Sequence, residues 1–256
     1  MKPHTPDSSA RAALIIVLVF VLLWEGGVRL FSVPVYLLPA PSTILLTLAQ
    51  NASMYAQATL LTVGEALAGL LLGVLAGVII AVLLTLVPHI EAGVMSLAIM
   101  IKSTPLVAIA PLLTLWLGFG VLPKIIITAL LTFFPVLVNV ISGLQRVDGA
   151  LLDLFRSWRA SRWKLFLYLR LPSAVPYIFA ALKISAPLAI TGAVVAEWTG
   201  ASGGLGRVMW LAYANLNLPY LFAPIVILAA IGISLYRLLA HAERRLVFWL
   251  PSSTVE

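Results

Sequence analysis

Charged side chains inside long apolar stretches are the first sign of chemistry in this sequence. Lys102 and Lys183 lie within such stretches, Glu65 begins one, and Glu197 ends another. A charge at the centre of a bilayer costs about 2.5–3.5 kcal/mol on insertion scales, so such residues face a bundle interior or a wet path. We therefore predict that Lys102, Lys183 and Glu197 belong to a translocation path, with ion pairing as the alternative. For Glu65, near a span end, a structural ion pair or a side chain that reaches the interface is favoured.

Prolines interrupt the same apolar stretches. Pro105 and Pro111 flank five residues that follow Lys102, and Pro135 and Pro187 lie in the next two stretches. Broken helices at membrane depth are tolerated where their backbone is buried in protein or lines a cavity. Pro105 is therefore added to the predicted path residues, and simple kinking is the alternative.

Motifs for covalent or metal chemistry are missing from the sequence. It has no cysteine, which excludes thiolate catalysis and Cys-ligated metal sites. It has no H-E-x-x-H motif and no paired-carboxylate cluster, and His4, His89 and His241 lie near termini or span ends. We therefore expect no catalytic residue and no metal site.

Glycines four residues apart mark a packing surface. Gly69, Gly73 and Gly77 share one face of the second apolar stretch. Such a smooth stripe lets another helix approach closely. Ordinary bundle packing is the favoured interpretation, and a moving or subunit interface is the alternative.

The elements that position these residues must be membrane helices. Hydrophobic residues make up 62% of the 256 residues and charged residues only 10%, against roughly 45–50% and about 25% in soluble domains. A spanning helix needs about 20 apolar residues. The sequence therefore predicts an all-α membrane protein with a single transmembrane domain over residues 1–256, a core of about 58–245, and about six transmembrane helices. The predicted spans are Ala12–Leu30, Gly64–Val87, Gly93–Trp116, Lys124–Leu144, Ile178–Val195 and Tyr220–Ala240.

The distribution of basic residues predicts the orientation. With both termini in the cytoplasm, eleven of the 16 Lys and Arg residues fall on the cytoplasmic side and Arg29, Lys124 and Arg207 fall outside, which follows the positive-inside rule. The net charge of +7 is thus a topology signal and not a nucleic-acid-binding patch. The cytoplasmic residues are Lys2, Arg11, Arg146, Arg156, Arg159, Arg162, Lys164, Arg170, Arg237, Arg244 and Arg245.

The connection of about residues 146–177 is the only sizeable cytoplasmic segment. Apolar residues recur with helical periodicity from Leu151 to Trp158. A second helix is expected to begin at Ser161 and to end at Leu171-Pro172. The segment can be a docking element or a helix lying on lipid headgroups, and the residues alone leave both open.

This segment resembles the "EAA" loop of binding-protein-dependent ABC transporter permeases. Asp153 takes the place of the glutamate, and Leu171-Pro172 match the terminal L-P. Further pieces resemble the nitrate/sulfonate/taurine branch of these permeases, in the right order along the chain. They are residues 38–42, residues 105–120, residues 172–177 and residues 194–197.

The resemblance implies a permease subunit of an ABC importer in a cytoplasmic (inner) membrane. It implies three partners: a cytoplasmic ABC ATPase, a second permease subunit, expected to be a copy of this chain, and an extracytoplasmic substrate-binding protein. The chain has no G-x-x-x-x-G-K-[ST] motif, so ATP would be used by the partner and no cofactor by this chain. The implied ATPase-coupling residues are Asp153, Leu154, Phe155, Arg156, Ser157, Trp158, Arg159, Ala160, Ser161, Arg162, Leu171 and Pro172.

Three departures from the family pattern bear on coupling. Leu154 and Phe155 replace the two alanines, which makes the docking surface bulkier. Arg159 replaces a glycine that would permit a positive φ, a conformation that costs energy for arginine. Either this turn has a different backbone, or Arg159 makes a contact that offsets the strain. Glu65 also stands where similar sequences often carry arginine.

The substrate is specified weakly. The stretch of residues 197–206 resembles permeases for thiamine-pyrimidine precursors or riboflavin, while nitrate, sulfonate or taurine transport stays open. The alternative function is an ion-coupled secondary transporter, which would work without an ATPase and would carry paired ionisable residues on facing broken helices.

Overall fold

The structure, a computed structural model, describes residues 6–249, with side chains from residue 11 onward; Lys2 and His4 lie outside these residues. Within this range every regular element is a helix, as the composition predicts. The helices are α1 (Pro6–Leu30), α2 (Pro41–Gln50), α3 (Ala52–Leu86), η1 (Pro88–Ile90), α4 (Glu91–Ser103), α5 (Leu106–Leu117), α6 (Leu122–Gln145), α7 (Gly149–Ser157), α8 (Arg162–Leu165), η2 (Phe166–Arg170), α9 (Leu171–Glu197), α10 (Leu205–Ala214) and α11 (Leu218–Leu246).

Five stretches of the described residues are long and apolar enough to cross a membrane, and a bent helix pair makes a sixth. The pair is α4 with α5, and the two axes meet at 91°. The third predicted span, Gly93–Trp116, is therefore broken, as the prolines within it indicated, and not merely kinked. The break falls at Thr104, which is extended (ψ 128°) because the following Pro105 disfavours the helical conformation.

Two predicted span boundaries are also wrong. The second span begins at Ala52 instead of Gly64, because residues 52–63, which lie between the first two predicted spans, belong to α3. The same connection also contains α2. The fifth begins at Arg162 instead of Ile178, so Leu171-Pro172 do not end a helix. Pro172 follows directly on the π-helical turn η2, which joins α8 to α9, so the regular hydrogen-bond ladder is already interrupted where the proline lacks its N–H.

The core is the contact of α3, α6 and α9. Gly69, Gly73 and Gly77 face α6, and a Cβ on Gly73 would lie 2.1 Å from Thr132 Oγ1. The glycines therefore let α3 and α6 approach to a distance that any side chain would prevent. Next to the glycines, apolar residues of all three helices pack into one cluster, which includes the fully buried Leu84, Leu137 and Ala181.

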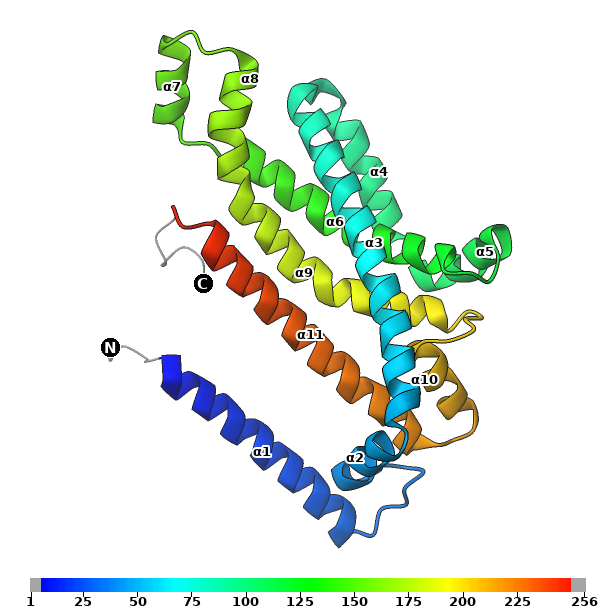
Figure 1. The fold of residues 1–256 in the computed structure, drawn as a ribbon. Helices are drawn as coiled ribbons and strands as arrows, with labels where there is room; N and C mark the ends of the chain where they lie inside the picture. Colours follow the sequence, from blue (N-terminus) through cyan, green and yellow to red (C-terminus); the bar gives the residue numbers. More distant parts are fainter. Residues whose placement is uncertain (1–5, 250–256) are drawn as a thin grey trace.

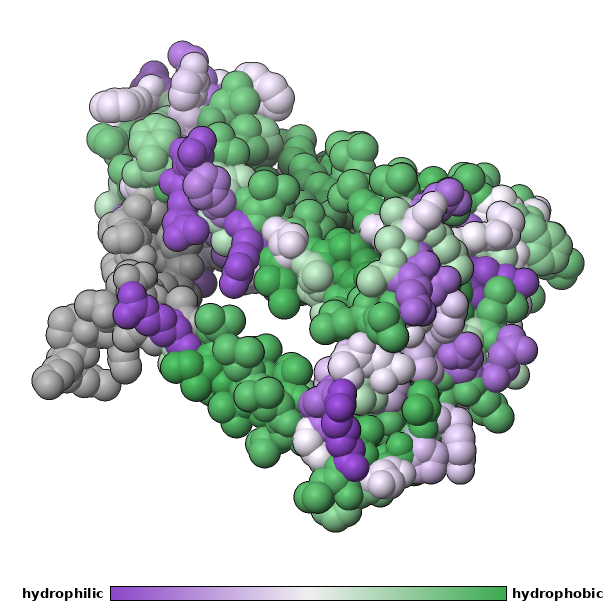
Figure 2. Space-filling model, turned by 60° about the horizontal axis from the view of Figure 1, so that its bottom comes forward, coloured by the Kyte–Doolittle hydropathy of each residue, from purple (hydrophilic) through white to green (hydrophobic). Residues whose placement is uncertain are grey.

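The ends of the helices gather in two groups (Figure 1). At one end lie α7 and α8, together with the beginning of α1 and the end of α11; we call this the α7 end. At the opposite end lie α2, α5 and α10; we call this the α10 end. Between the two ends the surface is largely apolar (Figure 2). Helix α1 is almost entirely exposed, since only 6% of the residues in its most apolar part are buried. Such a surface suits lipid or a neighbouring membrane helix.

Candidate functional site

Helix α7 is a short amphipathic helix with defined caps. The Asp148 side chain caps its first turn by accepting a hydrogen bond from Ala150 N at 2.8 Å. At its other end, Ala160 N donates to Phe155 O at 3.0 Å and Arg159 N donates to Arg156 O at 2.9 Å. This pair of hydrogen bonds is a Schellman motif, whose turning residue is usually glycine. Here it is Arg159, with φ 51°. The turn thus keeps the left-handed backbone that a glycine would favour.

The turn from α7 to α8 exposes aromatic side chains. Trp158 is 69% exposed and Trp163 is 61% exposed. Each stands beside a phenylalanine: the ring centroids of Trp158 and Phe155 are 6.1 Å apart, and those of Trp163 and Phe166 are 5.7 Å apart. Phe166 is buried in the core. The exposed unit is therefore anchored to the bundle through α8 and η2.

The predicted coupling residues lie along this unit. Asp153 and Arg156 are both exposed and form an ion pair of 3.3 Å, which is worth at most about 1 kcal/mol. Ser161 caps α8 by accepting from Lys164 N. Leu171 and Pro172 stand apart from the turn, half-buried at the beginning of α9. Ten of the twelve thus form one exposed helix-turn, residues 153–162.

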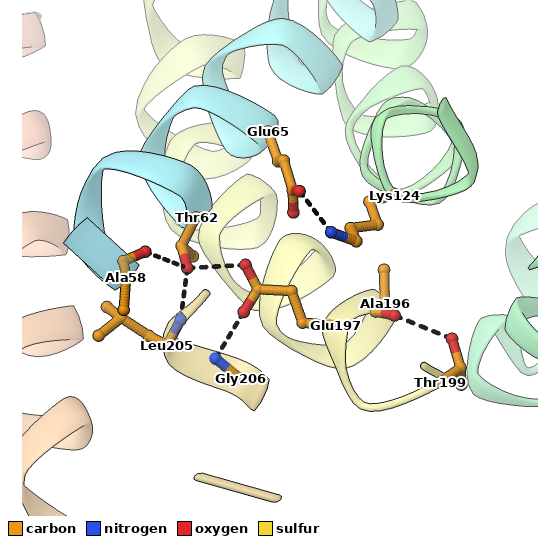
Figure 3. A network of polar contacts seen from close by, with 9 residues as sticks. All are labelled: Ala58, Thr62, Glu65, Lys124, Ala196, Glu197, Thr199, Leu205 and Gly206. Atoms are coloured by element: carbon orange, nitrogen blue, oxygen red, sulfur yellow. Dashed lines mark hydrogen bonds and ion pairs between the residues drawn. The ribbon is translucent and has the colours of Figure 1, made fainter. Parts of the chain in front are cut away.

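The second polar site is buried between α3, α6 and α9 (Figure 3). Lys124 Nζ lies 2.6 Å from Glu65 Oε1, and the two side chains are only 8% and 3% exposed. Glu65 is thus held in an ion pair, which is the interpretation favoured from the sequence. Lys124, which the sequence placed at the outer end of the fourth span, is the partner. The pair ties α3 to α6.

Glu197 lies beside this pair and is fully buried. Its carboxylate accepts a hydrogen bond from Thr62 Oγ1 at 2.7 Å and another from Gly206 N. Thr62 Oγ1 in turn accepts from Leu205 N at 2.8 Å (Figure 3). Leu205 and Gly206 are the first two residues of α10. Glu197 and Thr62 therefore bind the beginning of α10 from two other helices.

The four predicted path residues do not meet in one site. Lys102 is exposed on α4, with Nζ 4.5 Å from the centre of the Phe134 ring, and Pro105 is the N-cap residue of α5, at the bend. Lys183 pairs with Glu243 of α11 at 2.7 Å. Lys183 and Glu197 are separated by about 21 Å along α9 at 1.5 Å per residue. Their roles in a path stay predictions.

Sequence reasoning missed the partners in these contacts. Thr62 and Glu243 were not singled out, because they are 135 and 60 residues away from Glu197 and Lys183. One signal was present: Glu243 is an acidic residue in the last apolar helix, as Glu65 is in the second. In the part of the chain that the structure describes, no three His, Asp or Glu side chains come together to hold a metal ion.

The chain is similar along most of its length to known transport proteins. It is 38% identical over 223 residues (87% of this chain, 91% of the relative) to a "probable ABC transporter permease protein" of Haemophilus influenzae. It is 33% identical to the formylaminopyrimidine transport permease protein of Halalkalibacterium halodurans (91% and 93% covered). It is also 33% identical to the riboflavin transport system permease protein of Chloroflexus aurantiacus (96% and 92% covered).

The fold itself is that of solved importer permeases. The structure of an amino acid ABC transporter matches with a TM-score of 0.63 at 22% identity, over 78% of this chain and 98% of that one. Residues 73–248 match the family described as "Binding-protein-dependent transport system inner membrane component". The chain therefore belongs to this family, and it is the inner-membrane permease subunit of an ABC importer.

Proposed function

We propose that this permease couples to a separate cytoplasmic ATPase through the exposed turn of α7 and α8. The observation that carries the proposal is the combination of exposure and anchoring: Trp158 stands out from the surface, while Phe166 of the same unit is buried in the core. A force applied to the turn is thereby transmitted to α9. The ATPase would use the ATP, and this chain would bind no cofactor.

The chemistry of the turn specifies the partner's surface. Its basic residues outnumber its acidic ones, with Arg156, Arg159, Arg162 and Lys164 against Asp153. Its aromatic side chains fill more space than the alanines of the family pattern. The matching cleft of the ATPase is therefore wide, apolar at its base and acidic at its rim.

A second copy of the chain completes the translocation path in this proposal, and a soluble binding protein delivers the substrate to the α10 end. The bend between α4 and α5, with Lys102 and Pro105, is the part of the path that is open at the surface. The α7 end, where α1 begins and α11 ends, faces the cytoplasm, as the basic residues predict.

The substrate we propose is a small nitrogen heterocycle of the thiamine-pyrimidine or riboflavin type. The support is twofold: residues 197–206 carry the resemblance, and two relatives of 33% identity are named as formylaminopyrimidine and riboflavin permeases. Uptake of labelled riboflavin and of labelled formylaminopyrimidine by cells that express the complete transporter tests this. Uptake of neither, with uptake of an alkanesulfonate, would assign the chain to the sulfonate branch.

Coupling is tested by Trp158→Asp and, separately, Asp153→Lys. Trp158→Asp places a negative charge against the apolar base and acidic rim of the cleft. Asp153→Lys reverses the charge at the position of the glutamate of the family pattern and breaks the ion pair with Arg156. For each variant we expect ATP-driven uptake to fall at least tenfold while membrane insertion is unchanged. Phe248→Asp is the matched control, because Phe248 is an 81% exposed aromatic residue that follows α11 and lies outside the turn. Wild-type uptake in both test variants would contradict the proposal.

The partners are tested by purifying the tagged chain from gently solubilised membranes and identifying co-purified proteins by mass spectrometry. A stoichiometric P-loop ATPase, with this chain as the sole permease, supports the homodimeric transporter. A second, different permease would replace the homodimer by a heterodimer. Uptake that persists in a strain without the ATPase would favour the ion-coupled alternative.

A further inference from the structure

We propose that Glu197 and Thr62 are positioning residues that fix α10 to the bundle through hydrogen bonds, rather than groups that contact the substrate. The proposal concerns how the α10 end is held together. Its importance for transport rests on the proposed function, in which the α10 end receives the binding protein.

The beginning of α10 needs external partners. The first N–H groups of a helix have no acceptor within the helix, and a side chain at the N-cap usually supplies one. The N-cap of α10 is Gly204, which has no side chain. Thr62 Oγ1 accepts from Leu205 N, and Glu197 accepts from Gly206 N. The cap of α10 is therefore supplied by α3 and α9.

Two glycines lie directly against the Glu197 carboxylate and leave no room for a side chain. A Cβ on Gly204 would lie 2.1 Å from Glu197 Oε1, and a Cβ on Gly206 would lie 2.7 Å from Oε2. Gly204 also has φ 102°, which L-residues rarely adopt. The loop thus passes directly over the carboxylate. This geometry leaves Glu197 fully buried, with α10 seated on it.

Hydrogen-bond counting separates a positioning role from a charge role. The Thr62 hydroxyl lies 2.7 Å from Glu197 Oε1 and 3.1 Å from Ala58 O, so its single proton can serve either acceptor. In Glu197→Gln, the amide oxygen can still accept from Gly206 N. The amide nitrogen can donate to Thr62, whose proton then turns to Ala58 O. Glutamine therefore preserves every hydrogen bond to α10 without the charge, whereas alanine removes the one from Gly206 N and leaves Thr62 without its carboxylate partner.

Helix α10 carries an exposed aromatic surface that this cap sets in place. Trp210 is 43% exposed and Tyr213 is 63% exposed. Their ring centroids are 6.2 Å apart, and Trp198 lies 6.5 Å from Trp210. A shift of the first turn of α10 would move Trp210 and Tyr213 together.

The test uses the absence of cysteine from the chain. Ala212→Cys places one thiol on the buried face of α10, where Ala212 is 5% exposed. The full-length variant in nanodiscs, which expose both faces, is treated with a hydrophilic maleimide. Labelling rates are compared in four further backgrounds: Glu197→Ala, Glu197→Gln, Thr62→Val and Thr62→Ser. Tyr213→Cys in the same backgrounds is the exposed control.

We expect labelling of the Ala212→Cys thiol to accelerate at least tenfold with Glu197→Ala and with Thr62→Val, and to stay slow with Glu197→Gln and Thr62→Ser. The Tyr213→Cys thiol should label quickly throughout. Equal, fast labelling with Glu197→Gln and Glu197→Ala would overturn the proposal, because the charge would then be required. Slow labelling with both Glu197→Ala and Thr62→Val would overturn it as well.

Thr62→Val keeps the test decisive if Glu197→Ala fails to insert, because valine has nearly the shape of threonine. The assay needs neither ATP nor substrate. If the proposed function is wrong, the labelling result still decides this inference. If this inference is wrong, the outcome of the ATPase-coupling test is unaffected.

Discussion

The turn after α7 and the turn before α10 both pass through residues with positive φ, but with different residue types. The turn after α7 uses Arg159, with φ 51°, whereas the turn before α10 uses Gly200 and Gly204, with φ 109° and 102°. Arg159 is exposed, while a Cβ on Gly204 would overlap a buried carboxylate. A left-handed residue can thus be non-glycine at a cost where space is open, and must be glycine where another side chain fills the space.

The charges at the two ends differ in the same way. Asp153 and Arg156 form an exposed ion pair with side chains 77% and 71% exposed. Lys124 and Glu65 form a pair that is almost completely buried. Water and salt screen the first pair, whereas the second cannot lose one member without leaving a buried charge.

The largest expected effect on stability comes from breaking the buried pair. Lys124→Met leaves the Glu65 carboxylate without its cation, so we expect a loss of about 3–5 kcal/mol, measured by thermal unfolding of the purified chain. The double variant Glu65→Met/Lys124→Met should recover most of the loss. Asp153→Asn is the exposed control and should change stability by less than about 1 kcal/mol. Equal effects of Lys124→Met and Asp153→Asn would remove the contrast between the two ends.

The second prediction concerns the glycine at the α10 end. Gly204→Ala combines an unfavourable φ with a Cβ placed on Glu197, so we expect a loss of about 3 kcal/mol, at the upper end of ordinary single substitutions. Gly120→Ala is the matched control, because nothing lies within 4 Å of a Cβ there. The same unfolding assay applies. A harmless Gly204→Ala would show that the loop can move away from Glu197.

The smallest effect is a gain at the α7 end. Arg159→Gly relieves the left-handed conformation of a residue with a side chain, so we expect about 1 kcal/mol of added stability. The measurement is the unfolding midpoint. A destabilised Arg159→Gly would instead mean that the Arg159 side chain makes contacts that outweigh the strain.

Much of the fold follows from composition and periodicity. Long apolar stretches must become helices in a membrane, since every backbone group needs an internal partner there. Proline had opposite consequences at two positions. Pro105 broke a predicted span, whereas Pro172 did not end a helix, because it follows directly on the π-helical turn η2, where the regular hydrogen-bond ladder is already interrupted. Sequence spacing alone does not distinguish these two cases.

The sequence by itself determined the class of protein and the exposed turn of residues 153–162. It also determined the number of apolar spans, which is six if the bent pair of α4 and α5 counts as one span. These depend on local properties: hydropathy, helical periodicity and the order of motifs along the chain. Tertiary structure alone decided which charges are paired and what Glu197 binds. Lys183 meets Glu243 across 60 residues, and Glu197 meets Thr62 across 135. Such contacts depend on how the helices pack, and no spacing along one chain segment encodes them.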